Sequence, residues 1–201
     1  MEEADVTVNG QDQVVIGFAD QFVGVNPENG DRLWEQAHPC GGFNTAPPLF
    51  GPDNILVISS AYSCGSRALS LQQAGGKSVV KQLWANTRLR VHHGTLVRIG
   101  DQIYGSSGSS GPAPMTAIDV KTGAVAWQDR TFGKTTFVAA DGKLILLDED
   151  GQLALVRVSP KGMSVIAKAP VLERLSWTPP TLVGTNLYIR DQRTIMALDL
   201  K

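Results

Sequence analysis

The feature that most constrains the fold is a motif that recurs along the chain. The segment AIDVKTGAVAW (residues 117–127) aligns without a gap on GVNPENGDRLW (residues 24–34), and each segment ends in a tryptophan. A third tryptophan, Trp84, follows Trp34 by 50 residues and precedes Trp127 by 43. Repeats of about 40 residues are typical of β-propeller blades. The spacing therefore predicts a chain built from successive copies of one small unit.

A short apolar run after a turn supports the same period. It occurs five times, at residues 12–18, 53–59, 101–107, 141–147 and 184–190. β-branched and aromatic residues fill these runs, and no window keeps helical spacing without a glycine or proline. Four strands are expected in the third unit, at residues 94–99, 101–106, 115–120 and 124–128. Each unit is therefore predicted to be a four-stranded sheet.

The sequence thus predicts an all-β fold, a β-propeller of about five four-stranded blades, as an open arc or partial propeller. Residues 1–201 are expected to form a single domain. The repeat units are predicted at residues 4–38, 45–86, 91–132, 134–173 and 176–201, and the last unit lacks its outer strand.

The motif predicts how neighbouring blades are held together. Lys121 and Thr122 suit the middle of a type I turn shaped by Asp119, and Gly123 can take the left-handed conformation that closes it. Trp127 then lies on the outermost strand, where its large ring can pack on the neighbouring sheet. The residues expected to have this structural docking role are Gly30, Trp34, Trp84, Asp119, Gly123 and Trp127.

The pattern A-x-D-x-x-T-G-x-x-x-W at residues 117–127 resembles the tryptophan-docking repeat of pyrroloquinoline quinone (PQQ) dehydrogenases. Residues 176–200, SWTPPTLVGTNLYIRDQRTIMALDL, are similar to the closing repeats of PQQ-binding-like propellers, a bacterial group that includes the assembly lipoprotein BamB. Such propellers have seven or eight blades, so the resemblance implies the C-terminal half of a longer protein without its N-terminal blades. A small open ring is the alternative. The resemblance also implies a periplasmic or secreted location, if a signal peptide before Met1 has been lost.

Composition and cysteine spacing exclude several classes of function. The net charge is −1, with 18 basic and 19 acidic residues spread along the chain, which gives no indication of nucleic-acid binding. No apolar run approaches the roughly 18 residues of a membrane span. Cys40 and Cys64 match neither zinc-binding nor CxxC spacing. Because they fall in adjacent loops of one predicted blade, either a disulfide or two separate thiols is possible.

Loops on one face of the propeller are the expected binding surface, because loops can vary while the sheets hold the fold. Alternation of loops in four-stranded blades places residues 38–45, 61–66, 86–93, 106–114, 148–151, 174–178 and 190–193 on that face. The candidate ligand-binding residues are Tyr62, Arg88, Arg90, His92, His93, Trp177 and Arg190. His92 and His93 are expected on opposite sides of a strand, so that they would not share a metal ion. Trp177 is open to two interpretations, core packing or ligand stacking.

Two functions follow from the resemblance. The first is a non-catalytic propeller that binds a protein, peptide or saccharide on its loop face, with no cofactor, metal or catalytic residue. The second is a PQQ- and calcium-dependent dehydrogenase of alcohols or sugars, which requires a carboxylate base beside a metal-bound quinone and often adjacent cysteines. This chain has no adjacent cysteines. The sequence therefore favours the binding module over the enzyme.

Overall fold

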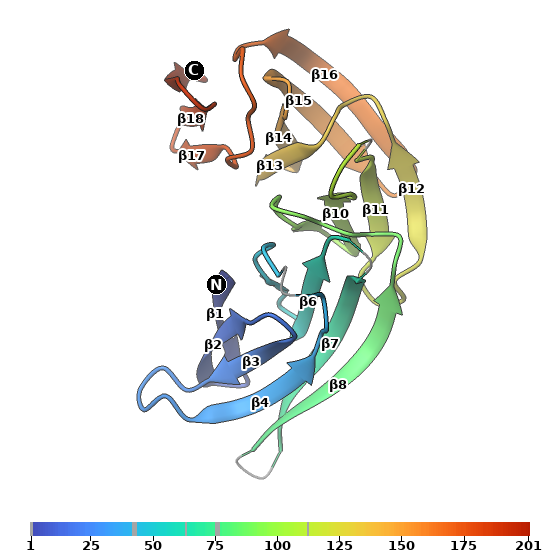
Figure 1. Cartoon of the computed structure of the whole chain (residues 1–201), viewed down its shortest axis with the longest axis vertical. Helices are drawn as coiled ribbons and strands as arrows, with labels where there is room; N and C mark the ends of the chain where they lie inside the picture. Colours follow the sequence, from blue (N-terminus) through green and yellow to red (C-terminus); the bar gives the residue numbers. More distant parts are fainter. Residues whose placement is uncertain (1, 42–43, 63, 75–76, 112) are drawn as a thin grey trace.

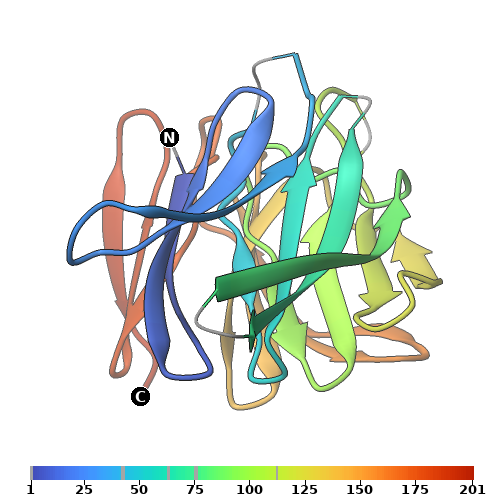
Figure 2. The same ribbon diagram turned by 90° about the horizontal axis from the view of Figure 1, so that it is seen from below.

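Five antiparallel sheets follow one another around an open arc. The computed structural model describes residues 2–41, 44–62, 64–74, 77–111 and 113–201. Four sheets have four strands and the last has three, each in sequence order from the inside of the arc outwards. Blade one and blade five face each other across a gap (Figure 1), and hairpins and loops close both ends of the blades (Figure 2). The prediction of an all-β partial propeller is confirmed.

Blades one to four contain four strands each and blade five contains three. Blade one contains β1 (Glu2–Val8), β2 (Gln11–Gly17), β3 (Gln21–Val25) and β4 (Arg32–Ala37), and blade two contains β5 (Leu49–Phe50), β6 (Ile55–Ser60), β7 (Gly65–Ala74) and β8 (Lys77–Asn86). Blade three contains β9 (Val97–Ile99), β10 (Gln102–Ser106), β11 (Met115–Asp119) and β12 (Val125–Asp129). Blade four contains β13 (Thr135–Ala140), β14 (Lys143–Asp148), β15 (Gln152–Ser159) and β16 (Gly162–Pro170). Blade five contains β17 (Thr181–Val183), β18 (Asn186–Arg190) and β19 (Ile195–Asp199).

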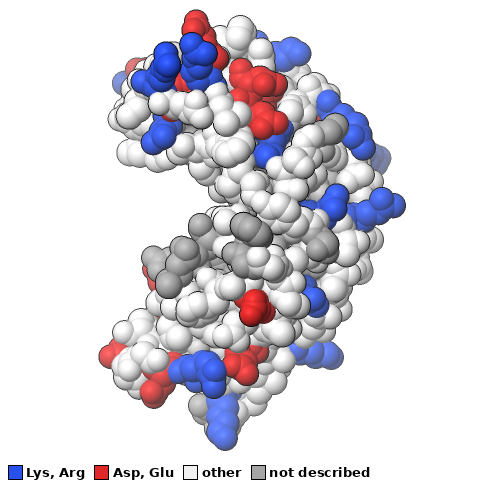
Figure 3. Space-filling model, in the orientation of Figure 1, with Lys and Arg blue, Asp and Glu red and all other residues white. Residues whose placement is uncertain are grey.

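The hydrophobic core is a series of interfaces between neighbouring blades. The described residues form four apolar clusters, one for each junction, as in the packing of Phe22 in blade one with Leu56 and Leu69 in blade two. Alternation along each strand places one set of side chains toward the preceding blade and the other toward the following blade. Charged side chains of both signs are scattered over the face shown in Figure 3. No helix in the described ranges has the length and apolar character needed to cross a membrane.

The repeated turn has the geometry that its residues indicate. The carboxylate of Asp119 accepts hydrogen bonds from the backbone N–H of Lys121 (3.0 Å) and of Thr122 (2.8 Å), and from the Thr122 hydroxyl (2.8 Å). Burial alone would raise the pKa of Asp119, but these hydrogen bonds hold it below its usual value. Gly123 closes the turn with φ 70°, and Gly30 does so in blade one with φ 77°.

The docking tryptophans connect neighbouring blades. Trp84 in blade two donates its indole N–H to the backbone oxygen of Val120 in blade three (2.8 Å), and its ring lies against Gly123. A Cβ atom at Gly123 would lie 2.7 Å from Cδ2 of that ring, so only glycine fits there. Trp127 in turn donates to the backbone oxygen of Ser159 in blade four (2.8 Å). Both rings therefore join one sheet to the next.

Trp34 makes a different contact. Its indole N–H is donated to the buried side-chain oxygen of Gln13 in its own blade (2.7 Å), and the amide of Gln13 donates to Ser78 of blade two (3.3 Å). The ring packs in the apolar cluster between blades one and two and lies over Gly24. The hydrogen bonds from Trp34 to blade two therefore pass through the side-chain amide of Gln13.

Candidate functional site

Four rings lie in contact on the loop face, where the connections between blades meet. Tyr62 comes from the β6–β7 loop, His92 and His93 from the β8–β9 connection, and Trp177 from the β16–β17 connection. Ring centroids are 5.5 Å apart for Tyr62 and His92, 5.0 Å for the two histidines, and 4.5 Å for His93 and Trp177, which are stacked. We call these four residues the ring row. It brings together residues from three separate connections.

The two histidines are neighbours because the chain bends there. Val91 forms an isolated bridge with Ser107, and the bend at residues 92–94 follows it directly. The expectation that His92 and His93 point to opposite sides of a strand is therefore wrong. The Thr45 hydroxyl donates to the backbone oxygen of His92 (2.7 Å) and secures the bend.

Lys134 and Glu149 contact Trp177. The sequence prediction did not include these two charged residues in the site. The Lys134 ammonium lies 5.0 Å from the centroid of the ring and donates to the backbone oxygen of Ser109 (2.7 Å). The indole N–H of Trp177 is donated to the Glu149 carboxylate (3.2 Å). Lys134 immediately precedes β13 of blade four, whereas His93 lies four residues before β9 of blade three, so its place along the chain gave no signal of its role.

The histidines of the ring row are held neutral. Burial, followed by the nearby Lys134 charge and then by His92, lowers the pKa of His93 to about 4. Burial and Lys134 also lower the pKa of His92. Among the described residues, both ring nitrogens of His93, Nδ1 of His92 and the hydroxyl of the adjacent Thr135 are buried without a hydrogen-bond partner. The site therefore combines apolar ring faces with unused hydrogen-bonding groups.

The three candidate arginines differ in their relation to the ring row. Arg90 donates to the backbone oxygen of Tyr62 (3.1 Å), so it adjoins one end of the row. Arg88 is exposed on the same connection, and its backbone N–H is donated to the Asn86 side chain. Arg190 is exposed at the end of β18 in blade five, and the ring row takes no residue from that strand. The two ends of the row are themselves open to solvent, since Tyr62 is 43 % and Trp177 44 % exposed.

Cys40 and Cys64 form a disulfide near Tyr62, at one end of the ring row. Their Cα atoms are 5.6 Å apart, and the bond joins the β4–β5 connection to the β6–β7 loop that carries Tyr62. The cross-link therefore restrains the loop that presents the tyrosine.

A buried chain of hydrogen bonds lies below the loop face. Arg67 donates to Nδ1 of His38 (3.1 Å), so the ring proton lies on Nε2 and is donated to the Ser60 hydroxyl (3.1 Å). Ser60 donates in turn to the side-chain oxygen of Asn44, whose amide donates to Phe18. His38 therefore acts as a donor toward Ser60, and both side chains are fully buried. This arrangement is that of a structural link between blades and not of a serine nucleophile with its base.

The residues of the site do not fit a calcium–quinone centre. The described ranges contain no group of three His, Cys, Asp or Glu side chains that could hold a metal ion. In the acidic turn after β14, one oxygen of Asp148 accepts the backbone N–H groups of Asp150 (3.1 Å) and Gln152 (2.9 Å), so it closes the turn. Burial raises the pKa of Asp148. One face of Trp177 is stacked on His93, and the Lys134 ammonium lies near the ring.

Comparison with known proteins identifies the repeat. A family model described as "Outer membrane protein assembly factor BamB" matches residues 2–129. A search of curated proteins finds no match.

Several solved propellers share the fold. The β-propeller domain of Cps50 (Swd1) from Myceliophthora thermophila is 11 % identical with a TM-score of 0.67, over 97 % of this chain and 68 % of that one. A chain of the S. cerevisiae complex of Dbp5 L327V with Nup159, Gle1 H337R, IP6 and ADP is 12 % identical with a TM-score of 0.60, over 94 % of this chain and 51 % of that one. A europium-containing methanol dehydrogenase is 11 % identical with a TM-score of 0.55, over 83 % of this chain and 41 % of that one. The chain thus spans about half the length of the Dbp5 complex chain and less of the dehydrogenase.

Proposed function

We propose a function from the premise that the chain belongs to the family described as outer membrane protein assembly factor BamB. The chain is a non-catalytic binding module, and the ring row on its loop face binds an extended polypeptide. The single observation that carries the proposal is the contact of Tyr62, His92, His93 and Trp177 in one row with both ends exposed. At protein interfaces a few residues, often Trp and Tyr, contribute most of the binding energy.

The chemistry of the row favours a polypeptide ligand. The exposed ring faces of Tyr62 and Trp177 can pack on the apolar side chains of a peptide. The family description, an assembly factor for outer-membrane proteins, supports a protein partner. A saccharide is the competing ligand, because aromatic rings also stack on sugars.

The disulfide supports a location outside the reducing cytoplasm. Cystine cross-links persist in the periplasm and in secreted proteins and are rare in the cytosol. The proposal is therefore a periplasmic or secreted module. Alkylation of the protein taken directly from cells, followed by mass spectrometry, should find Cys40 and Cys64 unmodified and linked, and two alkylated thiols would contradict this location.

Binding is tested with the immobilised chain and a urea-denatured outer-membrane porin diluted over it. The double variant Tyr62→Ala, Trp177→Ala should weaken binding at least about tenfold, because both exposed rings of the row are lost. Tyr188→Ala is the matched control, since Tyr188 is 42 % exposed on blade five away from the row, and it should bind like the wild type.

Three results would overturn the proposal. The first is equal porin binding by the double variant and the wild type. The second is binding of a glucan oligosaccharide but not of the porin, which would identify a saccharide site. The third is stoichiometric binding of PQQ with calcium together with dye-linked alcohol oxidation, which would identify a dehydrogenase.

A further inference from the structure

The loop connections around Tyr62 carry positive charge and no negative charge. The Gly108 N–H is donated to the backbone oxygen of Arg90 (2.8 Å), so the β10–β11 loop lies beside the β8–β9 connection. Four connections meet at this end of the ring row and contain no Asp or Glu, namely residues 38–48, 61–64, 87–96 and 107–114. Among Asp, Glu, Lys and Arg they contain only Arg88 and Arg90. A ligand that reaches Tyr62 therefore meets a basic surface.

The two arginines project from one side of the β8–β9 connection. Burial alternates along this segment, because Leu89 and Val91 are fully buried whereas Arg88 and Arg90 are exposed. Residues two apart in an extended segment lie on the same side, about 6–7 Å from each other. The next position on that side is His92, a member of the ring row. The two guanidinium groups therefore lead directly to the rings.

Neither arginine is neutralised within the described part of the chain. The ion pairs found there involve other basic residues, namely Arg32, Arg98 and Lys121. The Arg90 guanidinium donates one N–H group to the backbone oxygen of Tyr62 (3.1 Å), which positions the group at the end of the row but leaves its charge uncompensated. An occupant with acidic groups would complement this surface.

The spacing of the guanidinium groups matches that of side chains on an extended polypeptide. A planar guanidinium binds a carboxylate through two parallel hydrogen bonds. Alternate side chains of an extended peptide also lie on one side of its backbone, about 6–7 Å apart. Two acidic residues separated by one other residue can therefore face Arg88 and Arg90, while a nearby apolar side chain packs on the exposed ring of Tyr62.

We propose that the ligand of the ring row is an acidic polypeptide segment, with two acidic residues on Arg88 and Arg90 and an apolar residue on Tyr62. This inference rests on the proposed function and names the class of polypeptide that the site selects. A neutral segment can pack on the rings, but it leaves both guanidinium groups without a partner. Because exposed ion pairs are individually weak, the arginines select among polypeptides and speed association more than they add affinity.

Two synthetic peptides test the charge of the ligand. The acidic peptide contains a phenylalanine and two aspartates separated by one alanine, and the amide peptide has asparagine in place of each aspartate. Both are fluorescently labelled and titrated with the whole chain, with binding followed by anisotropy. The acidic peptide should bind about five- to tenfold more tightly, as expected for two exposed ion pairs. The difference should shrink when salt is raised from about 0.1 M to about 1 M, because salt screens exposed charges.

Variants of the chain assign the preference to the arginines. Arg88→Gln with Arg90→Gln should bind the two peptides equally and should bind the denatured porin more weakly than the wild type does. Arg88→Gln alone keeps the bond from Arg90 to Tyr62, so it should reduce the preference without disturbing the loop. The matched control is Lys81→Gln with Arg157→Gln, which removes the same charge from exposed positions in β8 and β15 and should keep the wild-type preference.

This inference fails on any of three results, while porin binding by the wild type would leave the proposed function intact. The first is equal binding of the acidic and amide peptides by the wild type. The second is an unchanged preference in the variant without both arginines. The third is binding to phosphatidylglycerol vesicles that this variant loses, with no preference between the peptides, which would assign the arginines to a lipid surface. A wild type that binds neither peptide nor the porin would instead overturn the proposed function itself.

Discussion

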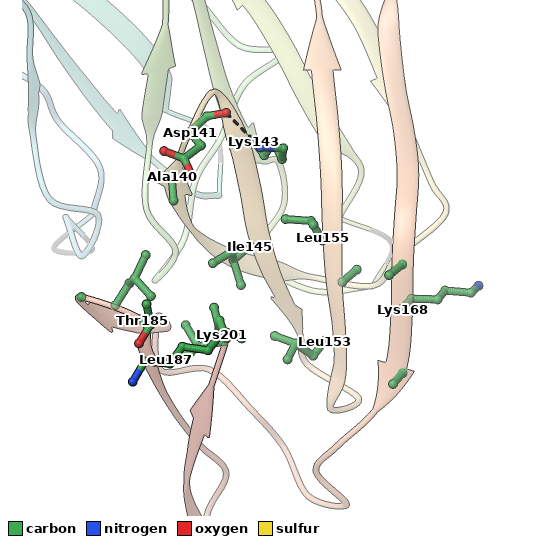
Figure 4. A pocket seen from close by; sticks show the side chains of 16 residues that line it. Ala140, Asp141, Lys143, Ile145, Leu153, Leu155, Lys168, Thr185, Leu187 and Lys201 are labelled. Atoms are coloured by element: carbon green, nitrogen blue, oxygen red, sulfur yellow. Dashed lines mark hydrogen bonds between the residues drawn. The ribbon is translucent and has the colours of Figure 1, made fainter.

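The junction between blades two and three and the junction between blades four and five solve the same packing problem differently. At the first, Trp84 is 8 % exposed, covers Gly123 and bonds to Val120 of the next blade. At the second, Leu155 and Ala167 occupy the equivalent pair of β15 and β16, and a cavity of about 610 Å³ remains (Figure 4). The register shift is the same in both blades. The backbone of a blade therefore forms without the ring, and the ring serves to fill the junction between blades.

The largest difference between the junctions should appear on removal of the ring. Trp84→Ala is expected to lower the free energy of unfolding by about 3–5 kcal/mol, because it leaves a cavity and an unbonded Val120 oxygen. Trp127→Ala should cost less, since that ring is only half-buried. Urea unfolding measures both. A cost below about 1 kcal/mol for Trp84→Ala would mean that the junction does not depend on its ring.

The junction between blades one and two should respond to acid through His38. Burial, followed by the Arg67 charge, lowers the pKa of His38 from 6.5 to about 4. The unfolded chain binds this proton more readily, so stability is full above pH 6.5 and decreases as the pH falls toward 4, by up to about 3 kcal/mol. Urea unfolding between pH 7 and 4 measures the slope. His38→Gln keeps a hydrogen-bonding side chain and should reduce it, whereas an unchanged slope would exclude His38 as the cause.

Substitutions at Gly123 and Gly30 can distinguish the cost of backbone strain from the cost of a steric clash with a neighbouring ring. Gly123 and Gly30 have φ 70° and 77°, but a Cβ atom would meet the Trp84 ring at Gly123 and nothing within 4 Å at Gly30. Both changes to alanine carry the left-handed strain of roughly 1–2 kcal/mol. Gly123→Ala should cost about 1–2 kcal/mol more, because the ring must move. Equal costs in thermal unfolding would show that the ring adjusts freely.

The smallest expected effect is a gain. Leu155→Ala with Ala167→Trp should raise the free energy of unfolding by about 1 kcal/mol, as cavity-filling changes commonly do. Ala167→Trp alone should gain less or lose stability, because Leu155 then opposes the ring. Urea unfolding of the pair and of the single variant makes the comparison. A double variant less stable than the single one would show that the two junctions are not equivalent.

Much of the fold could be predicted because turns and tryptophans are local signals. Asp119, Thr122 and Gly123 shape their turn through bonds within five residues, so their spacing is visible in the sequence. The ring row could be predicted only in part from the sequence. Its members were recognised as loop residues, but their order and contacts depend on connections from blades that are far apart in sequence. The bend at His92 and His93 and the role of Lys134 were missed for the same reason.

The sequence by itself determined the blade, its turns, its strand count and the residues that dock one blade on the next. These follow from hydrogen bonds and alternation over a few neighbours, which each repeat carries in full. Only the tertiary structure decided which loops meet in the ring row and which junction holds a cavity. Blade four has Leu155 and Ala167 where the other blades have a small residue and a tryptophan. All of these residues are apolar, so the strand pattern is unchanged. The resulting cavity appears only when two blades pack face to face.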